Sequence, residues 1–420
     1  MNKEDNIVIT GIGIISPLGD SKEKFWKNEF SGESRFYKSN LMEKNGLKSR
    51  FISKIYEFEP DNYLDNDDLS RVKQSSRYSQ LALIAANEAI RDSKIMEEEI
   101  DLNKVGTIFS SAIGGTPEIQ KTYETLTDGG INELRYKNVG VEFYNSGMFN
   151  YPATVISSKY NFQGPCFSLS TGCTAGMDAM GEGMQLIQDG ELDVAIVGAS
   201  EAPLSSLTYS TLDSIGALSK WTGDPSGASR PFDRDRCGFV ISESSAFLVI
   251  EKESHAYKRG ANIYCKIKSF SSHNNSLHMT DLKDSNALQH TIKECLIRGN
   301  LSINDIDYIN AHGSSTQQND LCESNAIKKI FTDNFHRIPV SSTKSMMGHP
   351  LSSASLVAIV STIGSMKYGT IPPNINLDNV DVNCNLNLPV KKIKMSINNS
   401  LIMASGFGGI HSSCILSKVK

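Results

Sequence analysis

The chain has 420 residues, of which 39% are hydrophobic and 21% charged, with a formal net charge of −5 and a pI near 6.0. That share of apolar residues supports a sizeable core and excludes the disordered and fibrous classes. The negative net charge argues against a global attraction to nucleic acid or to an anionic membrane. No apolar run approaches the roughly 20 residues that span a bilayer.

Eight cysteines are scattered along the chain without a C-x-x-C pair or a zinc-type spacing. In a chain of this length, the pattern indicates reduced thiols in the cytosol, most of them small buried residues. We therefore expect a cytoplasmic protein without a metal site.

Apolar β-rich runs alternate with helical patterns, which is typical of α/β proteins. In chain order, strands are expected over 6–14, 105–111, 193–198, 239–250, 264–269, 306–310, 400–404 and 412–416. Helices are expected over 75–92, 174–189, 281–299, 320–331 and 354–368. A polar stretch over 251–261 separates two strand patterns, so we place the boundary between two lobes, 1–260 and 261–420, near Gly260.

The segment 126–150 is polar and aromatic, has weak periodicity and contains Asp128-Gly129-Gly130. It is predicted to be a long loop excursion. Long ordered loops often serve binding or interfaces, but an ordinary surface loop fits the same pattern equally well.

The most informative local feature is FSLSTGCTAG over 167–176, where an apolar strand leads through small residues into a helix. We expect Cys173 at the helix N-terminus, where unpaired N–H groups and the helix dipole favour an anion. Such a position lowers the pKa of a thiol and produces a usable nucleophile. The alternative is a buried structural cysteine.

Three later features are weak when taken singly. His312 follows an apolar strand, where a histidine is more often structural than catalytic. Lys344 and His349 lie five residues apart, and the lysine alone reads as a solvated or salt-bridged side chain. The GFGG segment over 406–409 alone reads as a tight turn between two strands.

Taken together, Cys173, His312, Lys344, His349 and GFGG, in this order, resemble the β-ketoacyl synthase family of condensing enzymes. The resemblance covers nearly the whole chain. Its motifs are IVITGIGIISPLG (7–19), RPFDRDRCGF (230–239), HMT (278–280), INAHGSST (309–316), STKSMMGH (342–349) and GFGG (406–409). It implies an α/β chain with the thiolase-like fold, in which two similar lobes form a five-layered αβαβα sandwich.

Finer details resemble one branch of the family, the ketosynthase alpha subunit of bacterial type II aromatic polyketide synthases. These details are STGCTAGMD over 170–178, INAHGSSTQQND over 309–320 and ASGFGG over 404–409. Fatty-acid enzymes usually carry FGFGG at the last motif. Here the first Phe becomes Ser405, whereas the second, which gates the acyl pocket in the family, is kept as Phe407.

The resemblance implies a role for each matching residue. Cys173 would hold the growing acyl chain as a thioester, and the backbone N–H groups of Cys173 and Phe407 would form the oxyanion hole. His312 and His349 would promote decarboxylation of the malonyl unit and stabilise the resulting enolate. The enolate would then attack the thioester and extend the chain by two carbons.

Supporting roles follow from the same resemblance. Lys344 would orient the loop around the catalytic histidine by pairing with Asp320 and Glu323, because a buried lysine needs such partners to stay charged. Thr316 and Thr343 would hydrogen-bond the pantetheine arm or nearby backbone, and would line the substrate pocket together with Ser405 and Phe407.

The resemblance also implies two partners and no bound cofactor. The malonyl unit would arrive on the phosphopantetheine arm of an acyl carrier protein. A chain length factor, a homologue that lacks the nucleophile, would complete a heterodimer, and the 126–150 segment would reach its pocket. Arg71, Lys73 and Arg77 would form a basic patch that docks the acidic carrier, although a solvated helix face explains them as well.

Three other functions fit parts of the pattern. A β-ketoacyl synthase II of fatty-acid synthesis shares the catalytic set, but Ser405 and the STGCTAG box count against it. A non-catalytic chain length factor would lack the nucleophile that Cys173 supplies. A thiolase that uses free coenzyme A is not excluded by fold alone, but thiolases use a second cysteine, and the Cys-His-His set counts against this function.

Overall fold

A ten-stranded mixed sheet runs through the computed structural model, which describes residues 6–40, 46–97, 99–280, 282 and 284–419. The sheet consists of two halves of five strands each. In spatial order, the N-terminal half contains β5 (Cys166–Leu169), β4 (Val105–Ser110), β6 (Val194–Glu201), β8 (Ser244–Lys252) and β1 (Ile7–Ile15). β5, β4 and β6 run parallel, whereas β8 is antiparallel to both of its neighbours.

The C-terminal half repeats this arrangement. In spatial order, it contains β11 (Val340–Ser341), β10 (Tyr308–Asn310), β14 (Asn399–Gly406), β15 (Ile410–Ser417) and β9 (Cys265–Asn274). Again the first three strands are parallel and the fourth is antiparallel to both neighbours. If the five strands of each half are numbered in chain order, both halves have the spatial order 3-2-4-5-1. The two halves join where β1 pairs with β9, with Ile7 opposite Ile267. The prediction of two similar lobes is confirmed, while their boundary near Gly260 stays a prediction.

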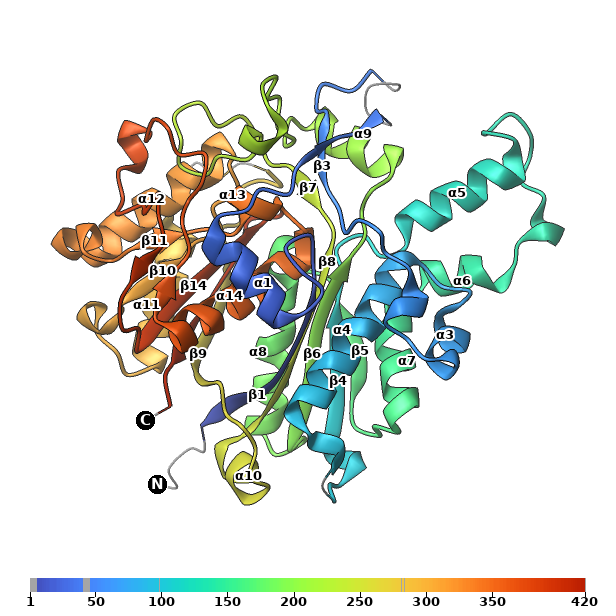
Figure 1. Cartoon of the computed structure of the whole chain (residues 1–420), viewed down its shortest axis with the longest axis horizontal. Coiled ribbons are helices and arrows are strands. Elements are labelled where there is room, and N and C mark those ends of the chain that lie inside the picture. Colours follow the sequence, from blue (N-terminus) through green and yellow to red (C-terminus); the bar gives the residue numbers. More distant parts are fainter. Residues whose placement is uncertain (1–5, 41–45, 98, 281, 283, 420) are drawn as a thin grey trace.

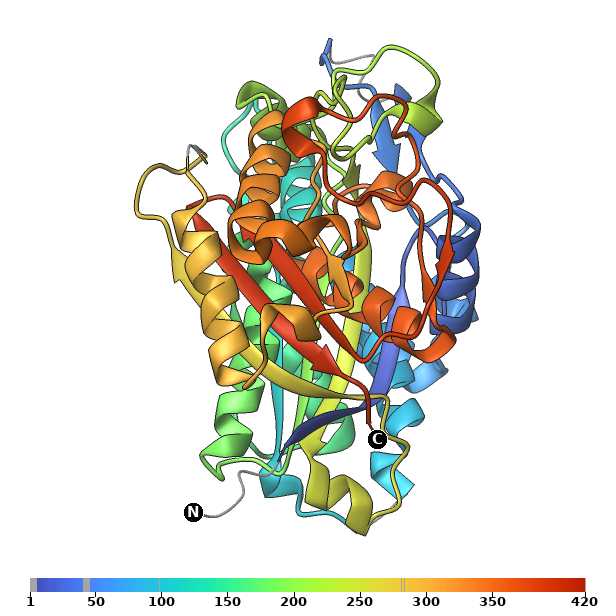
Figure 2. The same cartoon turned by 90° about the vertical axis from the view of Figure 1, so that its left-hand side faces the viewer.

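Helices cover both faces of each half, so the molecule has five layers (Figures 1 and 2). α4 (Arg77–Ser93) and α7 (Tyr151–Tyr160) pack outside the N-terminal half. α11 (Asn286–Arg298) and α12 (Gln317–Phe331) pack outside the C-terminal half. α8 (Ala175–Gln188) and α14 (Ala354–Tyr368) form the layer between them.

The sequence of the two central helices explains their place. α14 is buried on every side from Ala354 to Met366, as its apolar and small residues allow. α8 carries glycines where each half of the sheet approaches it. A Cβ at Gly181 would lie 2.2 Å from Phe270 of β9, and a Cβ at Gly183 would lie 2.7 Å from Val197 of β6.

Shorter elements connect these layers. They are β2 (Tyr37–Lys38), β3 (Phe51–Ser53), β7 (Ile241–Ser242), β12 (Thr370–Ile371), β13 (Ile393–Lys394), α1 (Lys22–Ser31), α3 (Asn66–Val72), α5 (Thr116–Thr127), α6 (Val141–Gly147), α9 (Ser206–Ser214), α10 (Glu253–Lys258) and α13 (Lys344–Met347). Within the described ranges, no helix is long and apolar enough to cross a membrane.

The strand expected over 239–250 is divided into β7 and β8 at Glu243. The buried carboxylate of Glu243 accepts hydrogen bonds from the Ile55 amide at 2.7 Å and from the Arg77 guanidinium at 2.8 Å. An apolar run gives no sign of such a break, because the break is caused by partners that are distant in sequence. The helix expected over 281–299 begins at Asn286, and residues 281 and 283 lie outside the described residues.

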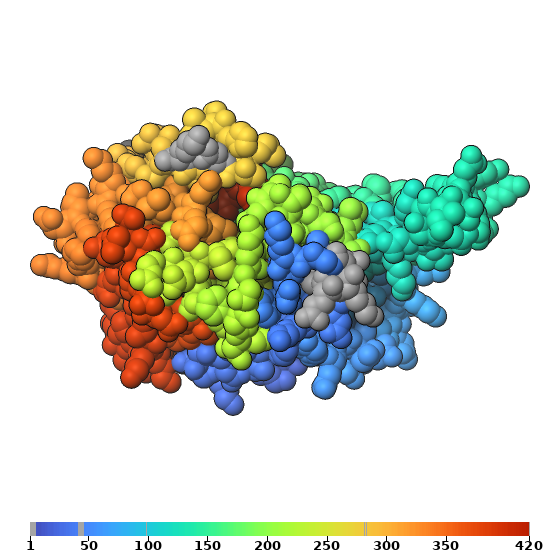
Figure 3. Space-filling model, turned by 90° about the horizontal axis from the view of Figure 1, so that it is seen from above, coloured from blue at the N-terminus to red at the C-terminus, as the bar shows by residue number. Residues whose placement is uncertain are grey.

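The 126–150 segment is not a plain loop. Together with α5 it forms an arm that projects from the body of the molecule, and α6 lies within it (Figures 1 and 3). Large apolar side chains are exposed along this arm. They are Tyr123, Ile131, Leu134, Tyr136, Val141, Tyr144, Met148 and Phe149.

Candidate active site

Cys173 occupies the turn that joins β5 to α8. It is the middle residue of a single 3-10 turn, Gly172–Thr174, which continues directly into the helix. Gly172 has φ of 67°, in the left-handed region that glycine adopts without strain. The strand–turn–helix context predicted from the small residues is therefore present, and only 5% of Cys173 is exposed.

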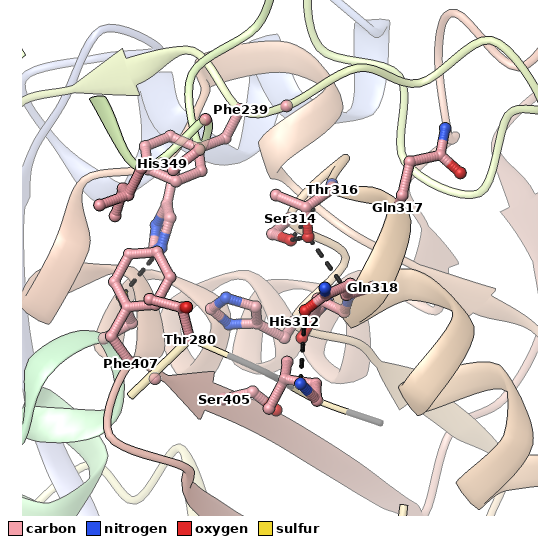
Figure 4. A pocket seen from close by; sticks show the side chains of 18 of the residues that line it. Phe239, Thr280, His312, Ser314, Thr316, Gln317, Gln318, His349, Ser405 and Phe407 are labelled. Atoms are coloured by element: carbon pink, nitrogen blue, oxygen red, sulfur yellow. Dashed lines mark hydrogen bonds between the residues drawn. The ribbon is translucent and has the colours of Figure 1, made fainter. Parts of the chain in front are cut away.

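A cavity of about 510 Å³ ends at this thiol. It brings together Cys173, His312, His349, Ser405 and Phe407, although these residues come from distant parts of the chain. Figure 3 shows a hollow on the upper face of the molecule, between the yellow-green, gold and orange segments. In Figure 4, His349 and Phe407 stand on one side of the cavity, and Ser314, Thr316 and Gln318 on the other.

The three predicted catalytic side chains are in contact. The Nε2 atom of His349 lies 3.1 Å from the Sγ atom of Cys173. The ring centroids of His312 and His349 are 5.0 Å apart, with the ring planes at 85°. The ring of Phe239 packs against His349 in a T-shaped contact, with centroids 4.9 Å apart, and so restricts the position of the imidazole.

Both histidines are neutral at physiological pH. Burial lowers the pKa of His312 well below its ordinary value of 6.5, and the Lys344 charge lowers it further. Burial and the same lysine charge also lower the pKa of His349 well below 6.5. A neutral imidazole has one N–H donor and one nitrogen that accepts a proton. The Nε2 atom of His349 can therefore accept the thiol proton in one tautomer and donate a hydrogen bond in the other.

The expected lowering of the thiol pKa is wrong for this resting state. Burial raises the pKa of Cys173 from 9.0 to about 12, and the nearby Glu201 charge acts in the same direction. The Lys344 charge and the N–H groups of Cys173 and Phe407 oppose this rise without reversing it. Because the thiol is protonated, His349 must accept its proton during attack rather than meet a preformed thiolate.

The backbone around Phe407 closes against the nucleophile. Gly406 packs so tightly that a Cβ there would lie 3.2 Å from the Cys173 amide nitrogen. The N–H groups of Cys173 and Phe407 both interact with the thiol. These are the two donors expected for an oxyanion hole. The Phe407 side chain is 37% exposed and lines the cavity, as expected for a gate.

Lys344 and Glu323 hold the peptide backbone at His312 from two sides. The Lys344 ammonium donates a 2.6 Å hydrogen bond to the His312 carbonyl. The Glu323 carboxylate accepts 2.7 Å hydrogen bonds from the amides of His312 and Gly313. Burial lowers the pKa of Lys344 and raises that of Glu323, while the attraction between the opposite charges limits both shifts.

The direct ion pairs predicted for Lys344 are absent among the described side chains. Asp320 instead accepts hydrogen bonds from the Phe232 amide at 2.9 Å and the Ser315 amide at 3.2 Å. It also lies 3.7 Å from the Arg236 guanidinium. Asp320 and Glu323 therefore position the loop around His312 by accepting hydrogen bonds from backbone amides. Lys344 positions the same loop by donating a hydrogen bond to the His312 carbonyl.

The two predicted threonines have different places. Thr316 lines the cavity and caps α12, accepting a hydrogen bond from the Asn319 amide. Thr343 is buried at the start of α13 and is not one of the residues that line the cavity, so its predicted contact with substrate is not supported. Its carbonyl accepts hydrogen bonds from the amides of Met346 and Met347.

Sequence reasoning missed His411. It lies directly opposite Ser405 in the β14–β15 pair, and its Nδ1 atom is 2.9 Å from the Ser405 hydroxyl. Burial lowers the pKa of His411 to about 4, so its imidazole is also neutral. The available signal was its position on a strand two residues after GFGG, because a residue so close to this turn lies at the cavity end of the sheet.

Comparison with known proteins decides the family. The model "Beta-ketoacyl synthase, N-terminal domain" matches residues 4–256, and "Beta-ketoacyl synthase, C-terminal domain" matches residues 264–378. This chain belongs to the β-ketoacyl synthase family. The predicted family and its class of activity, acyl transfer with condensation, are thereby confirmed.

Individual relatives of this β-ketoacyl synthase span its whole length. The tetracenomycin polyketide synthase ketoacyl synthase alpha subunit of Streptomyces glaucescens is 35% identical, over 99% of this chain and 98% of the relative. A 3-oxoacyl-[acyl-carrier-protein] synthase 2 of Coxiella burnetii is 32% identical, over 98% of each chain.

Among solved structures, a type II polyketide ketosynthase in complex with its acyl carrier protein is 34% identical to this β-ketoacyl synthase. The TM-score is 0.93, with 100% of both chains covered. A β-ketoacyl synthase from Burkholderia phymatum has a TM-score of 0.89 at 26% identity, over 99% of this chain and 100% of that one. These likenesses confirm the thiolase-like fold.

The three cations predicted to dock a carrier do not form a free patch on this β-ketoacyl synthase. Arg77 is paired with the buried Glu243 at 2.8 Å, and its guanidinium lies 4.3 Å from the centre of the Phe58 ring. Arg71 pairs with Asp67 one turn away at 3.0 Å. Lys73, which is exposed, remains a candidate contact.

Proposed function

We propose that this chain is the ketosynthase alpha subunit of a type II polyketide synthase. It would condense malonyl units, delivered on an acyl carrier protein, with an acyl chain held on Cys173, and so build a poly-β-ketone precursor of an aromatic polyketide. One observation carries the proposal: a buried thiol 3.1 Å from a neutral histidine, with a second histidine beside it, at the end of a 510 Å³ cavity.

Acyl transfer is the first step. The Cys173 sulfur attacks the carbonyl carbon of the carrier-bound thioester while its proton passes to Nε2 of His349. The N–H groups of Cys173 and Phe407 stabilise the oxyanion of the tetrahedral intermediate. When the bond to the carrier sulfur breaks, that thiolate takes the proton, and the acyl chain remains on Cys173.

Condensation follows when malonyl-carrier enters. The bond between the malonyl α-carbon and its carboxylate breaks, carbon dioxide leaves, and the electron pair forms an enolate on the thioester. His312 and His349, each neutral with one N–H, would donate hydrogen bonds to the enolate oxygen. The α-carbon then attacks the Cys173 thioester, the bond to the Cys173 sulfur breaks, and the departing thiolate takes up one proton from water, which the overall condensation consumes.

Residues at the cavity wall favour a polyketide chain over a fatty-acid chain. Overall identity does not separate the two, because the Streptomyces and Coxiella relatives are 35% and 32% identical. Ser405 places a hydroxyl, bonded to His411, on the cavity wall beside Phe407. A hydroxyl can hydrogen-bond an oxygen-rich chain, whereas the aromatic ring usual in fatty-acid enzymes would suit an alkyl chain.

Two surfaces support a heterodimer with a homologue that lacks the nucleophile. β5 forms an edge of the large sheet and has no second strand neighbour within the described ranges. An unpaired edge strand invites pairing with another chain. The arm of α5 and residues 126–150 exposes apolar side chains, including Ile131 at 85% and Tyr136 at 72%. Exposed apolar surface of this kind fits a partner chain.

We place this activity in the cytoplasm, because eight free thiols fit a reducing compartment. The substrate would enter on the phosphopantetheine arm of the carrier, past exposed Ile215 and Met279 at the cavity rim. Lys73 and Arg71 would contribute at most a minor contact with the acidic carrier.

The decisive experiment expresses the chain alone and with a homologue lacking the nucleophile, each with a carrier protein and malonyl units. We expect a heterodimer by mass measurement and a poly-β-ketone product only from the pair. A soluble homodimer that extends an acyl chain by single condensations without the homologue would instead favour the fatty-acid alternative. The Cys173→Ala variant of the pair is the control for activity from contaminating enzymes.

A further inference from the structure

The two oxyanion donors of this site come from separate segments. The Cys173 amide belongs to the turn before α8, and the Phe407 amide belongs to the turn between β14 and β15. Gly406 packs against the Cys173 backbone, but a packing contact resists separation only weakly. Something else must hold the two turns in register if both donors are to meet one oxygen atom.

Asp178 connects these segments. It lies in the first turn of α8, five residues after Cys173, and is only 8% exposed. One carboxylate oxygen accepts hydrogen bonds from the hydroxyls of Thr171 and Thr174, the latter at 2.7 Å. The other accepts from the hydroxyl of Ser412 on β15.

The three donors flank the reacting groups on both sides. Thr171 and Thr174 bracket Gly172 and Cys173, so their hydroxyls fix the ends of the nucleophile turn. Ser412 follows the GFGG turn by three residues, on the strand that pairs with β14. Each of the three hydroxyls donates to the Asp178 carboxyl group, which accepts at both of its oxygens.

We propose that Asp178 is a positioning residue for acyl transfer, which ties the Cys173 turn to the strand after Phe407 and thereby sets the separation of the two oxyanion donors. The inference rests on the proposed function, because it assumes that an acyl thioester reacts at Cys173. It concerns acyl transfer in particular, since His312 and His349 are held by other contacts, from Glu323, Lys344 and Phe239.

The hydroxyls have other acceptors if the carboxylate is removed. The Thr174 hydroxyl lies 3.0 Å from the Thr171 carbonyl, and the Ser412 hydroxyl lies 3.0 Å from the Ser272 hydroxyl. Loss of Asp178 therefore leaves few buried donors unsatisfied, and it removes chiefly the connection between the Cys173 turn and β15. A misplacement of about 1 Å at a reacting group costs on the order of 100-fold in rate.

The test measures the two half-reactions of the assembled enzyme separately. Acyl transfer from acyl-carrier to Cys173 is followed by intact-protein mass spectrometry in single turnover, and decarboxylation by carbon dioxide release from malonyl-carrier. For Asp178→Ala we expect acyl transfer to fall by about 10- to 100-fold, with carbon dioxide release within about threefold of wild type. Asp178→Asn should lie between, because its amide oxygen can still accept from the two threonines.

Glu29 provides a matched control. It is a fully buried carboxyl group on α1 that accepts a hydrogen bond from the Ser361 hydroxyl on α14. Glu29→Ala should lower the melting temperature as Asp178→Ala does. It should not slow acyl transfer more than it slows carbon dioxide release. If Asp178→Ala does not fold, Ser412→Ala and Thr174→Val, which keep the carboxylate, should each slow acyl transfer several-fold and combine non-additively.

Acyl transfer within twofold of wild type for Asp178→Ala, or equal loss in both half-reactions, would overturn the inference. Purely additive effects of Ser412→Ala and Thr174→Val would overturn it as well. A wild-type enzyme that acquires no acyl chain from any carrier would contradict the proposed function instead, so the two failures are distinguishable.

Discussion

The two halves of the sheet use the same turn for different purposes. In the N-terminal half, β5 leads through the 3-10 turn Gly172–Thr174 into α8. In the C-terminal half, the chain after β11 enters α14 through the 3-10 turn Leu351–Ser353. The first residue of each turn has positive φ, 67° for Gly172 and 43° for Leu351. Cys173 and Ser352 occupy the equivalent middle position.

Their surroundings differ completely. Cys173 ends a cavity and faces His349, whereas the fully buried hydroxyl of Ser352 donates a 2.6 Å hydrogen bond to Glu201. His349 precedes the C-terminal turn by only two residues, and its amide donates to the Val240 carbonyl at 2.7 Å. The comparison teaches that the turn itself is a structural device. In the N-terminal half the turn itself holds the nucleophile Cys173. In the C-terminal half the base His349 lies in the segment just before the turn.

The largest expected effect is loss of the nucleophile from the half that carries it. Cys173→Ala should lower acyl transfer by on the order of 10⁴-fold or more, because Cys173 is the one thiol among the described residues with a histidine in hydrogen-bond contact. Adding Ser352→Cys should not restore the activity, since that side chain is buried against Glu201. Mass spectrometry of the intact protein checks both, and an acyl adduct on the double variant would show that the two turns are functionally interchangeable.

The second effect separates the residues of the C-terminal half. His312→Ala should reduce carbon dioxide release from malonyl-carrier by about 10²- to 10⁴-fold while leaving acyl transfer less affected. His349→Ala should reduce both, because its Nε2 atom also faces the thiol. Lys344→Met should cost about 10-fold, because Glu323 still holds the amides of the His312 loop.

If Lys344→Met loses as much activity as either histidine variant, or more, at an unchanged melting temperature, this division of roles is wrong. The lysine would then take part in the chemistry itself rather than in positioning the loop.

Short motifs made much of this site predictable from sequence. Cys173, His312 and GFGG each lie at or shortly after the end of a strand, and His349 follows the short helix α13, so the order of these motifs along the chain was informative. The duplicated strand order was not readable, because strand pairing depends on contacts between distant residues. The same reason explains three other features that the sequence did not predict. They are the division of the strand at Glu243, the hydrogen bond from Lys344 to the His312 carbonyl and the burial of Thr343.

Electrostatic expectations failed in an instructive way. Helix position predicted a lowered thiol pKa at Cys173, but full burial has the larger effect and raises it. Lys73 and Arg77 looked alike in sequence, and only the fold pairs Arg77 with Glu243. Motifs identify which residues meet, whereas burial decides their charge.

A smaller effect tests the shared turn geometry. Gly172→Ala meets open space, since its nearest neighbour would be the Phe407 carbonyl oxygen at 3.8 Å. Its cost is therefore the left-handed conformation alone, about 1 kcal/mol of the free energy of unfolding, together with a loss of about 10-fold in acyl transfer from displacement of the thiol.

Leu351→Gly is the counterpart in the other half. Relief of strain should gain about 1 kcal/mol, but loss of a side chain that is only 5% exposed should cost about 2–3 kcal/mol. We expect a net lower free energy of unfolding by chemical denaturation, with little change in acyl transfer. A Leu351→Gly variant more stable than wild type would show that strain, not burial, dominates at this turn.

The smallest effect is a pH dependence of stability that has opposite signs for the two histidines and for the nucleophile. Folded His312 and His349 have pKa values well below 6.5, so the unfolded chain binds more protons as pH falls below 6.5, and stability is lost there. The folded Cys173 thiol has a pKa of about 12 against an ordinary 9.0. The folded state therefore binds more protons above pH 9, and stability is lost as pH rises.

Each buried histidine should contribute a loss of about 0.8 kcal/mol at pH 6, and the thiol a similar loss at pH 9.5. Chemical denaturation at pH 6, 7.5 and 9.5 measures both. His312→Ala should reduce the acid-side loss by about 0.8 kcal/mol and Cys173→Ala the alkaline-side loss by a similar amount. The other buried thiols, whose pKa burial also raises, still contribute on the alkaline side. Cys166→Ala, which removes an exposed thiol, is the control. A Cys173→Ala variant whose alkaline loss equals that of wild type would mean that the thiol ionises as easily folded as unfolded. The nucleophile would then be a ready thiolate, and His349 would not need to accept its proton.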